Sequence, residues 1–469
     1  MFHVKHAVFA GLAALGLFLA WPTSAAFEPA GVLTDWIDAK DYLPVGQPDG
    51  TTNNSAGIQA GLNAMCSATR PGGDFHMPPG HYRAHDITET CGGVHIKGAT
   101  AGTLGSGTTW DYSGATAYGL QFAPVGWPAV TSAQLLFSVS VEEIAFYDSA
   151  ADTTRALDFV GVDSSYASHI DFIGDIYNAI RVYGSYKVTL SNITSQVKNG
   201  IGTGITNFGI EITGDLSGQN SSAGACTLGN CSTRTDVVRI FNYDVATAST
   251  AEGIYIHGIA DTTAGANITI ENPGTGLDIE CDAGYANITY CPQFTQFTDF
   301  ETENFASEGL RLYDSSDFQC FGCYVIGAGV GALHAVDAGF TNYSQSRGTG
   351  GGVRLYGGRY GNVLGSAISF SVTDTKVIGA VVINANLGNI GAAGIEYVLG
   401  NEHYAMDNTF CDFLGTASPA MTAILLDLNA NPVSGGIFTG NQFYHCTAGI
   451  TDNSGSSSSL FVKANNLGP

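Results

Sequence analysis

Basic residues are scarce in this chain. Lys and Arg together number 17 of 469 residues, charged residues make up 12%, and the formal net charge is −24. So acidic a surface repels nucleic acid and anionic membranes, and we expect neither as a partner. A helical bundle would need more Glu, Lys and Leu, whereas 62 glycines suit turn-rich β structure. The composition therefore predicts mostly strands.

Long hydrophobic runs are absent after the first segment. Residues 7–20 form one apolar run, with Lys5 before it and small residues up to Ala26 after it. The run is too short to favour a membrane-spanning helix and is typical of a secretory signal peptide, although an uncleaved anchor is the alternative. We therefore predict a signal peptide over residues 1–26, a secreted or periplasmic mature chain, and no membrane partner after cleavage.

Cysteines, in contrast, are numerous for an exported chain, and ten of them favour disulfides. We predict pairing between neighbours in the sequence. The pairs are Cys66 with Cys91, Cys226 with Cys231, Cys281 with Cys291, Cys320 with Cys323, and Cys411 with Cys446. Cys320 and Cys323 have the spacing of a redox motif, but they lie in a strand-rich repeat without a βαβ context, which favours a structural role.

A helix and a hairpin-like unit are predicted near the N-terminus. Residues 51–55 offer capping side chains, and residues 55–66 place Ile58, Leu62 and Met65 at helical spacing. Residues 72–82, GGDFHMPPGHY, predict a strand, a Pro-Gly turn and a second strand. Together with the preceding Asp-Gly-Thr at 49–51, this stretch resembles the first segment of the pectate-lyase-like superfamily. The resemblance implies a right-handed parallel β-helix, as in phage tailspikes and many secreted polysaccharide-degrading enzymes.

A four-residue phrase repeats along the rest of the chain: a small residue, then hydrophobic, variable and hydrophobic residues. Copies begin at Ala156, Ala179, Gly209, Gly253, Gly276, Gly309, Gly352 and Gly394, with spacings of 23, 30, 44, 23, 33, 43 and 42 residues. Periods of about 20–30 residues with strand composition indicate a solenoid. The spacings near 43 indicate missing copies or inserted loops, and we interpret residues 217–235 as a disulfide-pinned loop.

These patterns predict an all-β chain, a right-handed parallel β-helix with a short N-terminal capping helix. We expect one domain over residues 27–469, with a cap and N-terminal segment over 27–100 and β-helix rungs over 101–469. No coiled-coil or trimerisation segment is visible, so we expect a monomer.

The variable residue of each phrase points to solvent, because its two hydrophobic neighbours point inward. When rungs stack, the variable residues form one column on the outer face. The residue two positions after each variable residue points to the same face and forms a second column. The first column contains Asp158, Arg181, Glu211, Tyr255, Asp278 and Arg311, and the second contains Tyr183, Thr213, His257, Glu280 and Tyr313. An isolated polar residue would be ordinary surface. Charges and aromatics gathered on neighbouring rungs of a charge-poor chain favour a saccharide groove instead.

The acids in this grid predict glycoside hydrolysis. Asp278 and Glu280 would lie about 6.5–7 Å apart along one strand, inside the separation of inverting hydrolases. One carboxyl group would protonate the leaving oxygen while the other activates water. Glu211 is a third candidate, and His257 and Tyr255 could tune the pKa values of the acids or hold the sugar. A polysaccharide is the expected partner, with candidate contacts from Asp158, Arg181, Tyr183, Arg311 and Tyr313.

Two other functions fit the same residues. In a polysaccharide lyase, Tyr255 or His257 would remove the proton beside a uronate carboxylate that Arg181 or Arg311 neutralises. A non-catalytic glycan-binding adhesin or structural protein is the other alternative. We predict no cofactor and no metal, although Asp278, Glu280 and Asp282 could recruit Ca²⁺.

Signatures of particular families are missing from the chain. Ile256-His257-Gly258 matches only part of the Gly-His-Gly of polygalacturonases, and their paired-Asp motifs do not occur. The calcium-and-arginine signature of pectate lyases is also absent. These absences argue against pectin as the substrate.

Overall fold

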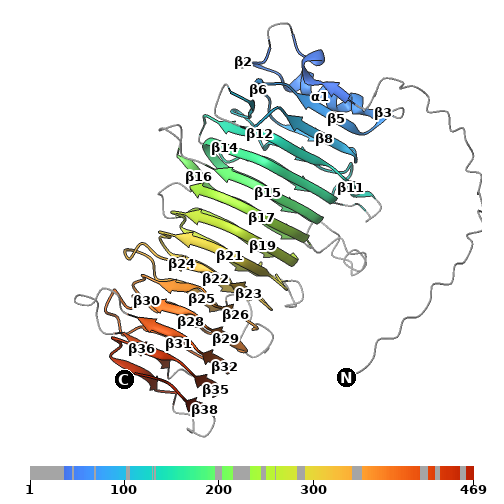
Figure 1. Cartoon of the computed structure of the whole chain (residues 1–469). Coiled ribbons are helices and arrows are strands. Elements are labelled where there is room, and N and C mark those ends of the chain that lie inside the picture. Colours follow the sequence, from blue (N-terminus) through green and yellow to red (C-terminus); the bar gives the residue numbers. More distant parts are fainter. Residues whose placement is uncertain are drawn as a thin grey trace, which may run out of the picture. The chain divides into compact units, whose positions relative to one another are not determined.

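In the computed structural model, parallel strands stack in chain order from the N-terminal cap toward β38 (Figure 1). The structure describes residues 36–44, 47–67, 70–101, 106–128, 130, 134–150, 152–195, 203–214, 233–244, 250–258, 260–282, 291–340, 351–411, 421–427, 434–454 and 461–468. The predicted signal peptide and residues 217–232 of the predicted loop lie outside these ranges. Residues 233–235, also predicted as loop, already belong to a strand. Within the described residues, no helix has the length and apolar character needed to cross a membrane.

The N-terminal elements match the sequence prediction. A short 3₁₀ helix, η1 (Ala39–Tyr42), precedes α1 (Ser55–Met65), and β5 (Gly73–Met77) and β6 (Gly80–Arg83) flank the predicted Pro-Gly turn. In α1, the predicted apolar residues Ile58, Leu62 and Met65 are completely buried. Just before the helix, the Asn53 side chain accepts a hydrogen bond from the Ser55 N–H at 2.9 Å. The helix therefore packs its apolar side against the first turns of the solenoid.

One parallel sheet carries the predicted site, and we call it the site sheet. Between its first and last strands, each strand pairs with the strand one turn before and the strand one turn after it. Within the described residues it contains β7 (Ile87–Glu89), β10 (Tyr118–Phe122), β13 (Arg155–Val160), the second half of β14 (Val162–Tyr183), β16 (Gly204–Gly214), β18 (Glu252–Gly258), β20 (Thr275–Glu280), β22 (Glu308–Tyr313), β25 (His334–Gly339), β28 (Ile368–Phe370), β31 (Ala393–Tyr397), β34 (Thr422–Leu426) and β37 (Ala448–Asp452).

The remaining parallel strands form a second ladder, which we call the flanking strands. From β21 onward, each turn contributes two short strands to it, so that a rung carries three strands in all. The flanking strands are β1 (Trp36–Asp38), β2 (Asp49–Asn53), β5, β6, β8 (Val94–Gly98), β9 (Thr108–Asp111), β11 (Leu136–Phe137), β12 (Ser140–Asp148), the first half of β14, β15 (Tyr186–Ser195), β17 (Thr233–Asp244), β19 (Ala260–Glu271), β21 (Gln296–Glu303), β23 (Gln319–Phe321), β24 (Tyr324–Ile326), β26 (Arg354–Tyr356), β27 (Arg359–Gly361), β29 (Thr375–Ile378), β30 (Val381–Ile383), β32 (Asn401–Met406), β33 (Thr409–Cys411), β35 (Ser434–Thr439), β36 (Gln442–Tyr444) and β38 (Phe461–Ala464).

Two further strands, β3 (Cys66–Ser67) and β4 (Arg70–Pro71), form an antiparallel pair beside the helix. Parallel winding starts earlier than residue 101, since β1 pairs with β5 and β5 with β8. Residues Asp35–Pro469 form one compact unit.

The repeated phrase identifies most strands of the site sheet, but one copy was misplaced. The phrase at Gly352 lies in β26, a flanking strand that pairs with β23 and β29. The true successors of β22 are β25 and β28. The 44-residue spacing hides no missing copy, because β16 pairs directly with β18.

Stacked apolar side chains fill the interior of the coil. Phe122 and Phe159 stack with ring centroids 5.4 Å apart on neighbouring rungs, and Phe146 and Phe172 stack at 5.8 Å. Such stacks arise because residues that pair in register on neighbouring strands place similar side chains directly above one another.

The exposed edge of the first site-sheet strand is covered by the helix. The Gln59 amide of α1 donates to the Thr88 carbonyl at 2.9 Å and accepts from the Thr88 N–H at 3.0 Å. One side chain thus replaces the missing neighbouring strand at β7, which prevents edge-to-edge pairing with another chain.

Three of the predicted disulfides are confirmed: Cys66–Cys91, Cys281–Cys291 and Cys320–Cys323. Cys226, Cys231 and the side chain of Cys411 lie outside what the structure describes, so the other two pairings stay predictions.

Candidate functional site

The predicted grid of outward residues is present on the site sheet. Its flanking apolar residues, such as Leu277 and Ile279, are buried in the core. In the first column the register runs Asp158, Arg181, Glu211, Tyr255, Asp278, Arg311 and then Asp337. In the second column it runs Tyr183, Thr213, His257 and Glu280. The sequence therefore placed these side chains on one face correctly.

We use the name carboxylate cluster for Glu211, Tyr255, His257, Asp278, Glu280, Asp282 and Arg311, which are joined by direct contacts. Arg311 binds two acids at once: its Nη1 lies 2.5 Å from Asp278 Oδ2 and its Nη2 lies 2.6 Å from Glu280 Oε2. The Tyr255 hydroxyl donates to the other oxygen of Glu280 at 2.6 Å. Glu280 therefore accepts one hydrogen bond on each of its two oxygens.

A second network centres on His257, whose ring stacks on Tyr255 with centroids 4.3 Å apart. The Nδ1 of His257 lies 2.8 Å from Asp282 Oδ1, and the Nε2 lies 3.1 Å from Glu211 Oε1. Arg155 adds a longer ion pair of 3.6 Å to the second oxygen of Glu211. An imidazole held between two carboxylates is favoured in its charged form, with both nitrogens donating.

The pKa values in the His257 network shift in opposite directions. Burial alone would lower the pKa of His257, but its hydrogen bonds and charge contacts with Asp282 and Glu211 raise that pKa to about 9. Burial opposes ionisation of Glu211, yet the hydrogen bond from His257 and the nearby positive charges hold its pKa below the usual value. At neutral pH the network therefore contains an imidazolium between carboxylates.

The pKa values around Asp278 are raised. Burial, followed by the nearby carboxylate of Glu252, raises the pKa of Asp278 to about 8, although the positive charge of Arg311 opposes this. Burial raises the pKa of Glu252 to about 7. Burial and the hydrogen bond to Glu280 raise the pKa of Tyr255 well above its usual value. The site therefore holds protonated groups and an acceptor carboxylate side by side.

Burial of the column corrects one expectation from the sequence. Asp158, Glu211 and Asp278 were expected to face solvent, but their exposed fractions are 1%, 7% and 0%. The physical reason is pairing across rungs, because arginine side chains lie over the carboxylates: Arg181 contacts Asp158 and Arg311 contacts Asp278. The accessible acids of the cluster are Glu280 and Asp282, whose side chains are 23% and 34% exposed.

The three acids considered for Ca²⁺ do not converge on one point. Asp278 and Glu280 bind Arg311, whereas Asp282 binds His257. This arrangement gives no support to the Ca²⁺ alternative at these three acids.

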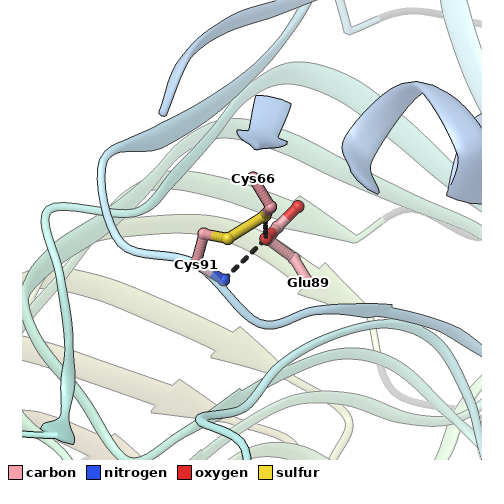
Figure 2. Close-up of side chains that lie close together, drawn as sticks. All are labelled: Cys66, Glu89 and Cys91. Carbon is pink, nitrogen blue, oxygen red and sulfur yellow. Dashed lines mark hydrogen bonds between the residues drawn. A yellow bond between two sulfur atoms is a disulfide. The ribbon is translucent and has the colours of Figure 1, made fainter. Parts of the chain in front are cut away.

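Elsewhere, Cys66, Glu89 and Cys91 have donor atoms close together (Figure 2). The Cys91 N–H donates to Glu89 Oε1 at 2.7 Å, and the Cys66 sulfur lies 2.9 Å from the same oxygen. The two sulfurs are bonded to each other as a disulfide, so neither is the thiolate that a metal site would need. We interpret this group as structural.

Two predicted contact residues lie at the edge of a pocket. Arg181 binds Asp158 through two hydrogen bonds of 2.8 and 2.7 Å, and its guanidinium lies 5.1 Å from the centre of the Tyr183 ring. Arg181 and Tyr183 line a pocket of about 430 Å³. At the other end of the face, Arg311 lies over the Tyr313 ring and the Tyr313 hydroxyl donates to Asp337 at 2.5 Å.

Known structures share this architecture, whereas no protein-family model and no curated sequence matches the chain. Tailspike protein 3 of bacteriophage CBA120 matches with a TM-score of 0.62 and 11% identity, covering 94% of this chain and 65% of that one. DFA-IIIase from Arthrobacter chlorophenolicus A6, without its lid, matches with a TM-score of 0.53 and 13% identity, covering 92% and 98%. The fold is a right-handed parallel β-helix. Identities this low show the fold alone.

Within the β-helix, sequence reasoning missed two residues that act on the cluster. Glu252 precedes Gly253, the small residue that opens its phrase, so the pattern of the phrase does not extend to it. Arg155 likewise precedes its phrase, two rungs from Glu211 in the stack. The repeated phrase does not include either position, so it gave no prediction for them. The sequence did show that each of these charged residues directly precedes a copy of the phrase.

Proposed function

We propose that this β-helix is a carbohydrate-active enzyme that hydrolyses glycosidic bonds of an extracellular or cell-wall polysaccharide. The observation that supports it is the pairing of Asp278 with Glu280 inside the carboxylate cluster. One carboxyl group has a pKa of about 8 and holds a proton near neutral pH, while its neighbour accepts hydrogen bonds from Tyr255 and Arg311. A carboxyl group that holds its proton, beside a second one that accepts hydrogen bonds, offers the acid and the base that hydrolysis needs.

In the proposed reaction, Asp278 gives its proton to the leaving glycosidic oxygen and Glu280 removes a proton from the attacking water. The water oxygen forms the new bond to the anomeric carbon as the bond to the leaving oxygen breaks. Asp278 has no exposed surface while Arg311 covers it. The reaction therefore requires the Arg311 side chain to turn away when sugar hydroxyls take over its contacts.

The structure gives less support to β-elimination. A lyase needs a base that is free of its proton at working pH. The raised pKa values of Tyr255 and His257 keep both groups protonated near neutral pH. Both cations that could neutralise a uronate are already paired, since Arg181 binds Asp158 and Arg311 binds two carboxylates.

A polysaccharide panel with two readouts tests the proposal. The purified chain is incubated with neutral and acidic polysaccharides, and reducing ends and the ultraviolet absorbance of unsaturated uronates are both measured. New reducing ends without absorbance are expected. Both signals together would indicate a lyase, and binding with neither signal would indicate an adhesin.

Amide variants test the residues. Asp278→Asn and Glu280→Gln should each abolish cleavage. Glu396→Gln is the matched control, since Glu396 occupies the same column on β31 and accepts from the Ser366 hydroxyl. It should retain full activity. Cleavage that persists in both cluster variants would contradict the assignment.

A further inference from the structure

A pocket lies on the same face as the carboxylate cluster, toward the N-terminal end of the site sheet. Its volume is about 430 Å³, within the range of about 300–1,000 Å³ for small-ligand sites. Strands β7, β10, β13 and β14 contribute to it, as does the turn that follows β10. The residues used below are Thr88, Thr90, Gln121, Trp127, Arg181 and Tyr183.

Two aromatic rings shape the pocket. Trp127 meets Tyr183 edge to face, with centroids 5.5 Å apart. The indole is fixed in place by Gly161, where even a Cβ would lie 2.5 Å from its ring. Its Nε1 is buried and finds no hydrogen-bond partner among the described residues. The ring of Trp127, rather than its N–H, is therefore what this residue offers to the pocket.

The polar groups of the pocket are neutral or already paired. Arg181 is the charged side chain among the described lining residues, and Asp158 neutralises it with two hydrogen bonds. Gln121 donates to the same carboxylate at 2.8 Å, which leaves its carbonyl oxygen as an acceptor for a ligand. Thr88 and Thr90 also line the pocket, and the Thr88 hydroxyl shares a hydrogen bond of 2.7 Å with the Tyr118 hydroxyl. An anionic sugar would need an uncompensated cation, whereas a neutral sugar matches these donors and acceptors.

The pocket is aligned with the carboxylate cluster along the stack. Arg181 and Asp278 are separated by three strand steps in the first column, and Tyr183 and Glu280 by three steps in the second. At about 4.8 Å per step the separation is about 14 Å. A glycan chain lying along the column would therefore reach both places at once.

We propose that this pocket is a binding subsite for an uncharged sugar unit of the polysaccharide. The inference rests on the proposed hydrolysis for its place along the glycan, but binding in the pocket is measurable without any turnover. The sugar ring packs against the Trp127–Tyr183 wall while its hydroxyls bond to Gln121 and the threonines. The substrate is then a neutral polysaccharide rather than a polyuronate.

Calorimetric titration tests this on the Glu280→Gln variant, in which substrate stays intact. The probes are neutral hexasaccharides of β-1,4-glucan, β-1,4-mannan, β-1,4-xylan and inulin-type fructan, with a hexagalacturonate of equal length for comparison. At least one neutral probe should bind, and the hexagalacturonate should not. Parallel incubation of the parent protein with each probe, followed by mass spectrometry of the products, shows separately whether cleavage occurs, so failure of hydrolysis and failure of binding are distinguished.

Two variants locate the binding. Trp127→Ala should weaken binding of the neutral probe by about tenfold or more, because it removes one aromatic wall. Thr90→Tyr fills the pocket from an exposed position, so it should weaken binding while thermal unfolding stays at the parent value. Unchanged affinity in Thr90→Tyr, preference for the hexagalacturonate, or no binding of any neutral probe would overturn the proposal.

Discussion

The sharpest physical prediction concerns the ionisation of Asp278, which burial opposes and the positive charge of Arg311 favours. Burial raises the pKa of this carboxyl group from an ordinary value of 3.8 to about 8 in the folded protein. The unfolded chain therefore releases the proton at much lower pH than the folded chain does. Between pH 4 and 8 this carboxyl group keeps its proton in the folded state and loses it in the unfolded chain. Its contribution to the free energy of unfolding therefore falls as pH rises, by about 1.4 kcal/mol per pH unit at most.

Asp278→Asn removes this titration while keeping the size of the side chain. At pH 4 the amide and the protonated acid are both neutral, so we expect similar stability. By pH 8 the variant should be more stable than the parent by several kcal/mol, since only the parent has lost stability to ionisation. Urea unfolding at pH 5, 6, 7 and 8 with the disulfides intact measures the difference.

The opposite result would refute the reasoning. If Arg311 keeps Asp278 ionised in the folded chain, Asp278→Asn would lose stability relative to the parent as pH rises. Glu396→Gln serves again as the control, because its carboxyl group is partly exposed on the same sheet. The effect of Asp278→Asn is read against this control at each pH.

Three further predictions concern stability. His257→Gln should destabilise the fold by about 3–5 kcal/mol at pH 6, because Glu211 loses its buried partner. The contribution of His257 is fully present below pH 6.5 and is lost as pH rises through about 9, so urea midpoints of parent and variant should converge by pH 10. Replacing Cys281 and Cys291 by Ser should cost about 2–4 kcal/mol, read from the urea midpoint, with no change expected under reducing conditions. Gln59→Ala should cost about 1–3 kcal/mol and should increase self-association in analytical ultracentrifugation, because it uncovers the edge of β7.

Much of the fold could be predicted from the sequence because a parallel β-helix repeats a simple constraint. Two inward hydrophobic residues around each variable position fix which side chains face outward, so the register of Glu211, Tyr255 and Asp278 followed from the phrase alone. The same simplicity caused the error at Gly352, because any strand with inward neighbours fits the phrase. β25 was missed since Ala338 stands where other copies carry a larger apolar residue.

The site was less predictable, because pairing across rungs depends on side-chain conformations that no periodic pattern encodes. The phrase placed Asp278 and Arg311 on one face, but it gave no sign that the guanidinium would cover the carboxylate. Trp127 came from a turn after β10 and carried no repeat signal, so the pocket was not predicted. The contacts of the site and the shape of the pocket depend on long charged side chains and on turns, whereas the repeat determines the path of the backbone.

The configuration of the first product tests the central claim most directly. Once the panel has identified a cleaved polysaccharide, proton NMR of the reaction within its first minutes reports the anomer released. Hydrolysis by Asp278 and Glu280 as acid and base predicts a saturated product with inverted anomeric configuration. A product with retained configuration, or with an unsaturated end, would contradict the account.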